Sequence, residues 1–173
     1  MAEQGPGGPP GLVAALTVST SRAGGEGVDE GGPALIEFAG SLGMGVAASE
    51  IVSDDRAQIS ARLRDLAARP DVALILTTGG TGFGPDDITP EATRDVIDRE
   101  APGIAEAIRA ASREHTPHWM LSRAVAGIRG KVLIVNFPGS PKSIAETGAA
   151  LAPALPHALR LLAGGTGGHQ PRP

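Results

Sequence analysis

Apolar residues along this chain form short continuous runs that are separated by segments of mixed polarity. Three of these runs have the length of strands, and turn-forming residues follow each of them. Continuous apolar runs of this length are typical of strands that are covered on both faces, as in a parallel sheet. These runs predict strands at residues 12–18, 72–76 and 131–136, and a further strand is predicted at 46–52, after the helix break at Gly43 and Gly45.

Between the strands, apolar residues recur at intervals of three and four positions, which predicts amphipathic helices. The clearest case is 56–69, where Ile59, Leu63 and Leu66 form one stripe. The other predicted helices are 33–41, 91–100, 104–113 and 144–162, the last broken at Pro153 and Pro156. Alternating strands and helices predict an α/β fold with right-handed crossovers. We therefore expect a three-layer sandwich, a mostly parallel sheet with helices on both faces.

The length of 173 residues fits one domain with a sizeable core. We expect that domain at residues 11–163, between glycine- and proline-rich flexible tails at 1–10 and 164–173. The first ten residues lack the basic start of a signal peptide, and no apolar run approaches the ~20 residues that span a bilayer. The expected location is the cytoplasm, without membrane association.

Composition excludes several kinds of site. The formal charge is −4 and there is no dense basic run, which argues against an electrostatic nucleic-acid binder. Cysteine is absent, which excludes disulfides, thiolate metal sites and cysteine nucleophiles. His115 and His118 have no third ligand nearby in sequence, and Pro117 between them disfavours a helical ligand pair, so zinc is not expected.

The segment at 77–91, T-T-G-G-T-G-F-G-P-D-D-I-T-P-E, carries most of the candidate chemistry. Its four glycines allow a tight turn that brings backbone N–H groups close to a ligand. Thr89 is the predicted helix N-cap, Pro90 the first helical residue, and Glu91 lies at the positive end of the helix dipole. A strand, a glycine turn and a helix start are together typical of phosphate sites.

Two carboxylates change the expected ligand of this loop. Asp86 and Asp87 would repel a bare phosphate, but they would hold a magnesium ion that bridges to one. Glycine-rich turns also occur where only tight packing is needed, and acidic pairs are often solvated. The coincidence of glycines, hydroxyls, carboxylates and a helix start within fifteen positions favours a site for a metal-bound polyphosphate.

A second loop, at 137–142, repeats the same order of features after the strand at 131–136. A glycine turn leads to Ser140 as the predicted N-cap and Pro141 as the first helical residue. Lys142 near a helix start opposes the helix dipole, which an anionic ligand would explain. A simple capped helix is the alternative.

Three further segments have both a functional and a structural interpretation. The hydroxyl-rich stretch 19–22 follows the first strand, where open α/β sheets bind ligands, or it is a surface linker. Asp54 or Asp55 either caps the following helix or serves the site. Ser122 and Arg123 are either an exposed pair or a phosphate contact.

The two glycine loops, taken in this order, resemble those of the MogA/MoaB family of molybdopterin adenylyltransferases. The similarity covers about residues 11–164 and includes the triplet 121–123. The same fold occurs in gephyrin-like and plant molybdenum-cofactor proteins. The resemblance implies that the terminal phosphate of molybdopterin attacks the α-phosphorus of Mg-ATP, giving adenylylated molybdopterin and pyrophosphate. Such a transfer depends on positioning and charge neutralisation.

The resemblance also implies roles for individual residues. Asp54 and Asp87 match the catalytic aspartates of the family and are expected to hold Mg²⁺. The expected phosphate- and molybdopterin-binding residues are Thr78, Gly79, Gly80, Thr81, Gly82, Thr89, Ser122 and Arg123. The expected nucleotide-binding residues are Pro138, Gly139, Ser140, Pro141 and Lys142.

One departure from the family pattern lies in the first loop. Many relatives carry an aspartate there, in a Ser-Asp-Arg pattern, where this chain has Ser21 before Arg22. The resemblance further implies a homotrimer and a downstream molybdenum-insertion enzyme as a partner. The alternative from another functional class is a carrier of the same fold that binds molybdopterin without catalysis.

Overall fold

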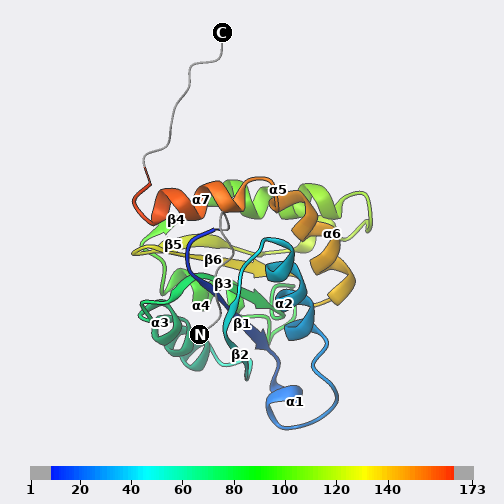
Figure 1. Ribbon diagram of the computed structural model, residues 1–173. Helices are drawn as coiled ribbons and strands as arrows, with labels where there is room; N and C mark the ends of the chain where they lie inside the picture. Colours follow the sequence, from blue (N-terminus) through cyan, green and yellow to red (C-terminus); the bar gives the residue numbers. More distant parts are fainter. Residues whose placement is uncertain (1–8, 166–173) are drawn as a thin grey trace.

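The structure is a computed structural model that describes residues 9–165 (Figure 1). Within this range six strands form one sheet in the order β2-β1-β3-β6-β5-β4. The strands are β1 (Leu12–Val18), β2 (Val46–Val52), β3 (Val72–Thr78), β4 (Arg99–Glu100), β5 (Ala126–Arg129) and β6 (Val132–Phe137). β2, β1, β3 and β6 are parallel, and β5 runs antiparallel to both β6 and β4.

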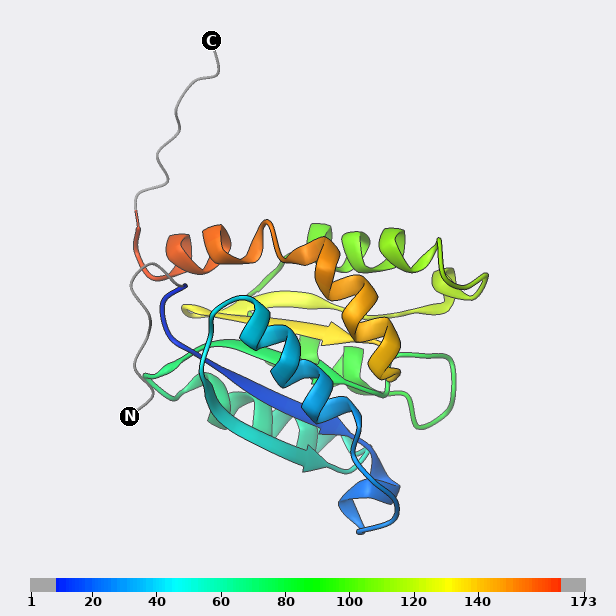
Figure 2. The same cartoon turned by 45° about the vertical axis from the view of Figure 1, so that its right-hand side comes forward.

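The helices connect the strands and cover both faces of the sheet, as the sequence predicts. They are α1 (Thr20–Ala23), α2 (Gly31–Ser41), α3 (Arg56–Ala67), α4 (Thr89–Arg94), α5 (Pro102–Ser112), α6 (Pro141–Leu151) and α7 (Leu155–Leu162), with a 3-10 turn η1 (Trp119–Leu121). Figure 2 shows α2 and α6 in front of the sheet and α3 behind it. Within residues 9–165, none of the helices is long and apolar enough to cross a membrane.

Two apolar clusters form the core, one on each face of the sheet. Successive side chains of a strand point to opposite faces, so β1 contributes Val13 and Ala15 to one cluster and Ala14 and Leu16 to the other. The first cluster packs the sheet against α2, α5, α6 and α7. The second packs it against α3 and α4. The inner parallel strands β1, β3 and β6 are thus buried on both faces, which explains their apolar sequences, whereas β2 at the edge of the sheet is partly exposed.

The prediction of one helix over 91–100 is wrong beyond Arg94. The backbone N–H of Asp98 donates to the carbonyl of Ile128 at 2.7 Å, and residues 99–100 then pair with β5. This antiparallel extension of the sheet competes with the helix and ends it. β5 itself was not predicted, because its four residues show no long apolar run.

At the carboxyl end of the chain, the predicted break at Pro153 is confirmed, since α6 ends at Leu151 and α7 begins at Leu155. The predicted break at Pro156 is wrong, because this proline lies in the first turn of α7, where its missing N–H has no helical partner to lose. The predicted tails fall almost wholly outside the described residues.

Candidate active site

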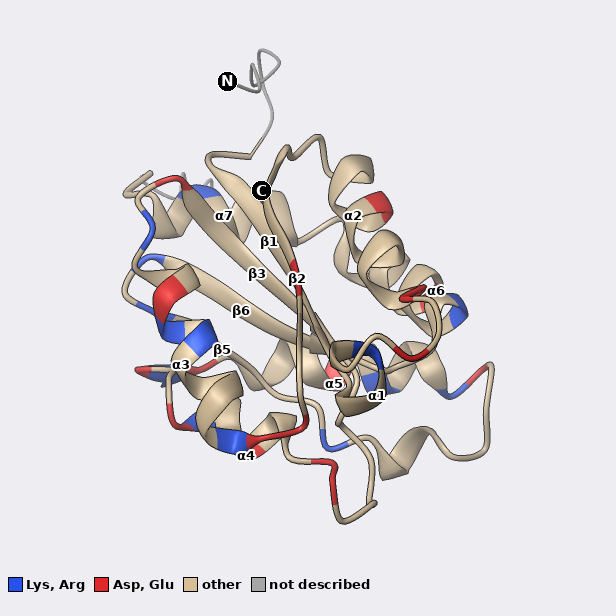
Figure 3. Ribbon diagram, turned by 90° about the horizontal axis from the view of Figure 1, so that it is seen from below, with Lys and Arg blue, Asp and Glu red and all other residues tan. Residues whose placement is uncertain are grey.

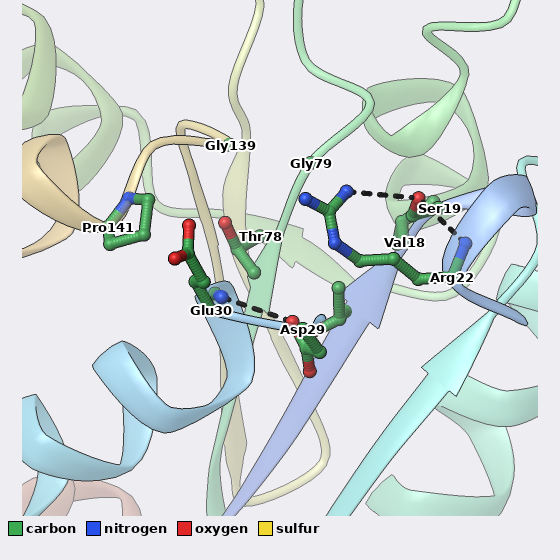
Figure 4. A pocket seen from close by; sticks show the side chains of 11 residues that line it. Val18, Ser19, Arg22, Asp29, Glu30, Thr78, Gly79, Gly139 and Pro141 are labelled. Atoms are coloured by element: carbon green, nitrogen blue, oxygen red, sulfur yellow. Dashed lines mark hydrogen bonds between the residues drawn. The ribbon is translucent and has the colours of Figure 1, made fainter. Parts of the chain in front are cut away.

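The carboxyl ends of β1, β3 and β6 meet at one edge of the sheet. The chain passes from β1 to β2 on one side of the sheet and from β3 to the strands on the other side. The point between β1 and β3, where the direction of the connections reverses, is where open α/β sheets bind ligands. A cavity of about 130 Å³ opens there (Figure 4). It is lined by Thr17, Val18, Ser19, Arg22, Asp29, Glu30, Gly31, Thr78, Gly79, Gly139 and Pro141. The cavity therefore joins the first loop, the start of α2 and both glycine loops.

The two glycine loops lie side by side. The hydroxyl of Thr78 donates to the carbonyl of Pro138 at 2.7 Å, which links the end of β3 to the loop after β6. A Cβ built on Gly139 would lie 3.6 Å from the Cα of Gly79, an ordinary contact. Sixty residues separate Thr78 from Pro138 in sequence, so the sheet brings these segments together.

The turn at Gly79 requires glycine. Its φ is +96°, and a Cβ there would lie 2.4 Å from the carbonyl oxygen of Val18. Both the left-handed backbone and the contact with a neighbouring strand exclude a side chain. The chain can therefore reverse directly above the end of β1.

Thr89 closes this turn, and its predicted role as N-cap is wrong. It is the first residue of α4, whose N-cap position is Ile88. The N–H of Thr89 donates to the carbonyl of Gly80 at 3.0 Å, and its hydroxyl donates to that of Gly79 at 2.9 Å. The hydroxyl of Thr89 therefore joins the start of α4 to the glycine loop.

The carboxylate of Asp87 turns back into the glycine loop. Its Oδ2 accepts from the N–H of Gly84 at 2.7 Å. A Cβ on Gly82 or on Gly84 would lie 2.9 Å from that same oxygen, so both glycines leave room for the carboxylate. Asp86, its neighbour, is exposed.

Asp54 and Asp55 divide the two roles that the sequence left open. Asp55 is the N-cap of α3, and its Oδ1 accepts from the N–H of Gln58 at 2.8 Å. Asp54 instead contacts Thr20 of the first loop: Oδ2 accepts from the N–H of Thr20 at 2.7 Å and from its hydroxyl at 2.9 Å. The other oxygen, Oδ1, would lie 3.5 Å from a Cβ built on Gly80. The glycine loop thus has Asp54 beside its start and Asp87 beside its end.

Figure 3 shows acidic residues, coloured red, on the loops beside α4. Between residues 9 and 165, no group of three or more His, Cys, Asp or Glu side chains could hold a metal ion. Asp54 and Asp87 carry carboxylate oxygens of the kind that Mg²⁺ prefers, so they are the residues that could hold this ion. His115 lies 3.4 Å from Glu146, which gives it a structural partner.

Arg123 is directed into the glycine loop. Its Nε donates to the carbonyl of Gly82 at 2.7 Å, and its Nη2 donates to that of Asp87 at 2.5 Å. It also forms an ion pair with Glu91 in the first turn of α4. The hydroxyl of Ser122 accepts from the N–H of Ala124 at 3.4 Å. Both residues are partly buried, so they are not the exposed pair that was one of the two interpretations of the sequence.

The second glycine loop has the predicted helix start, with Ser140 at the N-cap position and Pro141 as the first residue of α6. Among the described residues, the Ser140 side chain makes no capping hydrogen bond, which leaves its hydroxyl available. Lys142 is 85% exposed, and its Nζ lies 3.7 Å from Glu146 one turn later. Its ammonium group is thus exposed to solvent near the start of α6, next to the second glycine loop in sequence.

Asp29 lines the cavity and was missed in the sequence. It accepts from the hydroxyl of Thr17 at 2.9 Å and from the N–H groups of Gly31 and Gly32, both at 3.1 Å. These contacts fix the start of α2 against β1. The sequence does contain a signal for this role, because an acidic residue shortly before the Gly-Gly-Pro segment is typical of a helix start.

Comparison with known proteins decides the family. Residues 14–157 match the family model described as a probable molybdopterin binding domain. The chain belongs to that family. A molybdopterin adenylyltransferase from Escherichia coli is 40% identical over 137 residues, which are 78% of this chain and 70% of that protein.

Two further members of the family show how widely the domain is used. The molybdenum cofactor synthesis protein cinnamon from Drosophila melanogaster is 39% identical over 135 residues, 78% of this chain. The chain spans only 22% of the length of that protein. A crystal structure of the molybdopterin biosynthesis enzyme MoaB from Thermus thermophilus superposes with a TM-score of 0.83 at 47% identity, covering 89% of this chain and 97% of that one.

Proposed function

We propose that this protein is a molybdopterin adenylyltransferase, which transfers AMP from ATP to the terminal phosphate of molybdopterin and releases pyrophosphate. The observation that carries this proposal is the placement of Asp54 and Asp87 at the two ends of one glycine loop. That loop lies beside the second glycine loop at the ligand-binding edge of the sheet. The name of the E. coli relative supports the same reaction.

The reaction exchanges one phosphorus–oxygen bond for another. An oxygen of the molybdopterin phosphate bonds to the α-phosphorus of ATP, and the bond from that phosphorus to the bridging oxygen breaks. The electron pair of the broken bond leaves with pyrophosphate. Both reactants are anions, so the protein must align them and offset their charge, and no protein nucleophile is required.

The residues of the site fit this task. We assign Thr78–Thr81, Gly82 and Thr89 to the phosphate of molybdopterin and 138–142 to the nucleotide, with Lys142 as a cation that reaches the polyphosphate. The carboxylate of Asp54 is held by Thr20, and that of Asp87 by the N–H of Gly84. Both are therefore oriented before substrate binds, which lowers the cost of alignment.

Asp54 and Asp87 are the residues that would hold magnesium, because carboxylate oxygens are the protein ligands it prefers. When bound, Mg²⁺ offsets the charge of the polyphosphate. The homotrimer, the cytoplasmic location and the downstream molybdenum-insertion enzyme remain predictions, and sedimentation of the purified protein tests the first.

Mass spectrometry of the products tests the proposal. Purified protein is incubated with molybdopterin, ATP and magnesium, and the reaction is analysed for adenylylated molybdopterin and pyrophosphate. We expect both products in equal amounts. Tight binding of molybdopterin without either product would replace the enzyme by the carrier alternative.

A further inference from the structure

Arg123 makes contacts that a ligand-binding residue would leave free. Its guanidinium donates to two carbonyl oxygens of the glycine loop, Gly82 at 2.7 Å and Asp87 at 2.5 Å. These two carbonyls lie at the ends of the exposed tip 83–86, so one side chain joins both ends of the tip. The residue whose carboxylate we assign to the reaction, Asp87, is thereby fixed through its own backbone.

Glu91 fixes the orientation of that guanidinium. It lies in the first turn of α4 and forms an ion pair with Arg123, and both side chains are about one-third exposed. Burial acts to raise the pKa of Glu91, but the hydrogen bond from Arg123, the backbone N–H and the charges of Arg123 and Arg94 lower the pKa overall. Glu91 is therefore ionised at neutral pH, and a planar guanidinium paired with a carboxylate has one favoured orientation.

The backbone of Arg123 is fixed as well. Its N–H donates to the carbonyl of Thr81 at 2.9 Å. On the other side, Arg109 of α5 donates to the carbonyls of Ser122 at 3.4 Å and Ala124 at 3.1 Å, the two neighbours of Arg123. A continuous set of contacts thus leads from α5 through residues 122–124 to Asp87.

We propose that Arg123 is a positioning residue: with Glu91 as its partner, it holds the backbone of Asp87 so that the carboxylate faces the substrates. This inference rests on the proposed function, and it replaces the direct phosphate contact expected from the family resemblance. A guanidinium that already donates to two carbonyls and a carboxylate has few donors left for a phosphate. Glu91 acts one step further away and touches no reacting group.

The test separates positioning from ligand binding through kcat, KM and a structural measurement. The variants are Arg123→Ala and Glu91→Gln, with Arg94→Gln as the control, since Arg94 is an exposed cation of the same helix that pairs with Glu100. We expect kcat to fall about 10- to 100-fold in both variants, as for other residues that orient catalytic groups, with KM for molybdopterin changed less than about threefold. The control keeps the wild-type kcat.

Glu91→Gln is the decisive variant, because the two roles predict opposite results for it. A positioning role predicts a lower kcat, whereas a phosphate-binding Arg123 released from its carboxylate partner would bind molybdopterin as well or better. Hydrogen exchange of the amides at 82–88 is measured in parallel, and both variants should exchange faster there than the wild type. Raised KM in Arg123→Ala, with unchanged exchange and normal kcat in Glu91→Gln, would overturn the inference.

The exchange measurement also keeps this inference separate from the proposed function. If the wild type formed no adenylylated product, the proposed function would fail, and exchange at 82–88 would still report whether Arg123 and Glu91 hold the loop. Arg123→Lys provides a further check, since lysine keeps the charge but cannot donate to both carbonyls in the geometry of a guanidinium. We expect it to restore less than half of the lost kcat.

Discussion

The hydroxyl of Thr20 and the Asp54 residue exchange two hydrogen bonds. The hydroxyl donates to Oδ2 of Asp54 at 2.9 Å and accepts from the N–H of Asp54 at 3.0 Å. The N–H of Thr20 adds a third bond, of 2.7 Å, to the same carboxylate. This segment has Ser21 where the family resemblance leads us to expect an aspartate, and it contacts the site through Thr20.

Replacing Thr20 by valine removes the hydroxyl and keeps the shape of the side chain. We expect kcat for adenylyl transfer to fall about tenfold, because Asp54 loses one of the groups that orient it. Thr20→Ser should keep most of the wild-type rate. Ser21→Ala, at the exposed neighbouring position in α1, is the control and should be unchanged. Equal rates for Thr20→Val and Ser21→Ala would refute the role of Thr20.

Gly79→Ala should destabilise the protein through the backbone. Its φ of +96° and the 2.4 Å approach of a Cβ to the Val18 carbonyl oxygen both oppose a side chain. The expected loss in the free energy of unfolding is about 2–3 kcal/mol, measured by urea denaturation. Gly40→Ala, in α2 and with nothing within 4 Å in the described part of the chain, should instead be neutral or stabilising. Equal stability of the two variants would contradict this account of the turn.

Asn136 is fully buried and joins three segments of the fold. Its Nδ2 donates to the hydroxyls of Thr77 at 2.9 Å and Thr93 at 3.0 Å, and its Oδ1 accepts from the N–H of Val125 at 3.1 Å. Asn136→Leu leaves these partners buried without it, at a cost of about 1–3 kcal/mol for each unpaired group. We expect the midpoint of urea denaturation to fall clearly.

The control for Asn136 is Ser49→Ala on the exposed side of β2, which should stay within about 0.5 kcal/mol of the wild type. A similarly small effect of Asn136→Leu would mean that the buried contacts contribute little.

The ion pair between Glu50 of β2 and Arg62 of α3 should make stability depend on pH. The hydrogen bond from Arg62 lowers the pKa of Glu50 below its ordinary 4.5, while burial opposes the shift. A carboxyl whose pKa is lowered on folding stabilises the protein above its unfolded-state pKa, and the stabilisation disappears as pH falls through the lowered value. Glu50→Gln should therefore lose up to about 1 kcal/mol at pH 7.

The difference between wild type and Glu50→Gln should vanish at low pH, where the carboxyl is protonated in both states. Urea denaturation at pH 7 and near pH 2.5 measures it. Glu37→Gln, on the exposed side of α2, is the control and should change the free energy of unfolding at pH 7 by less than about 0.5 kcal/mol. A difference that persists unchanged at low pH would contradict the assigned cause.

Much of the parallel sheet is readable from the sequence. β1 and β2 begin and end at the predicted residues, β1 because it is an apolar run and β2 because glycines precede it and Ser53, Asp54 and Asp55 follow it. β4 and β5 are not readable in this way. β4 has two residues and β5 has four. Hydrogen bonds from the N–H groups of Asp98 and Ala101 to β5 hold the two strands together. A tertiary contact of this kind leaves no local pattern in the sequence.

The candidate site is likewise only partly readable from the sequence. The glycine loops and their carboxylates are visible in sequence, since backbone reversal and charge are local properties. The partners of those carboxylates are not, because Thr20 and Asp54 are 34 residues apart and Arg123 and Asp87 are 36 apart. Only the fold brings each pair together.

Asp87→Asn tests the central claim, that adenylyl transfer requires the carboxylate at the end of the glycine loop. The variant keeps the size of the side chain and removes its charge, and Asp86→Asn is the matched control at the exposed neighbouring position. Turnover of molybdopterin and ATP is followed by mass spectrometry, and binding of molybdopterin is measured separately. We predict that Asp87→Asn loses at least ~100-fold in turnover while binding stays within about threefold, and that Asp86→Asn resembles the wild type. Wild-type turnover by Asp87→Asn would contradict the claim.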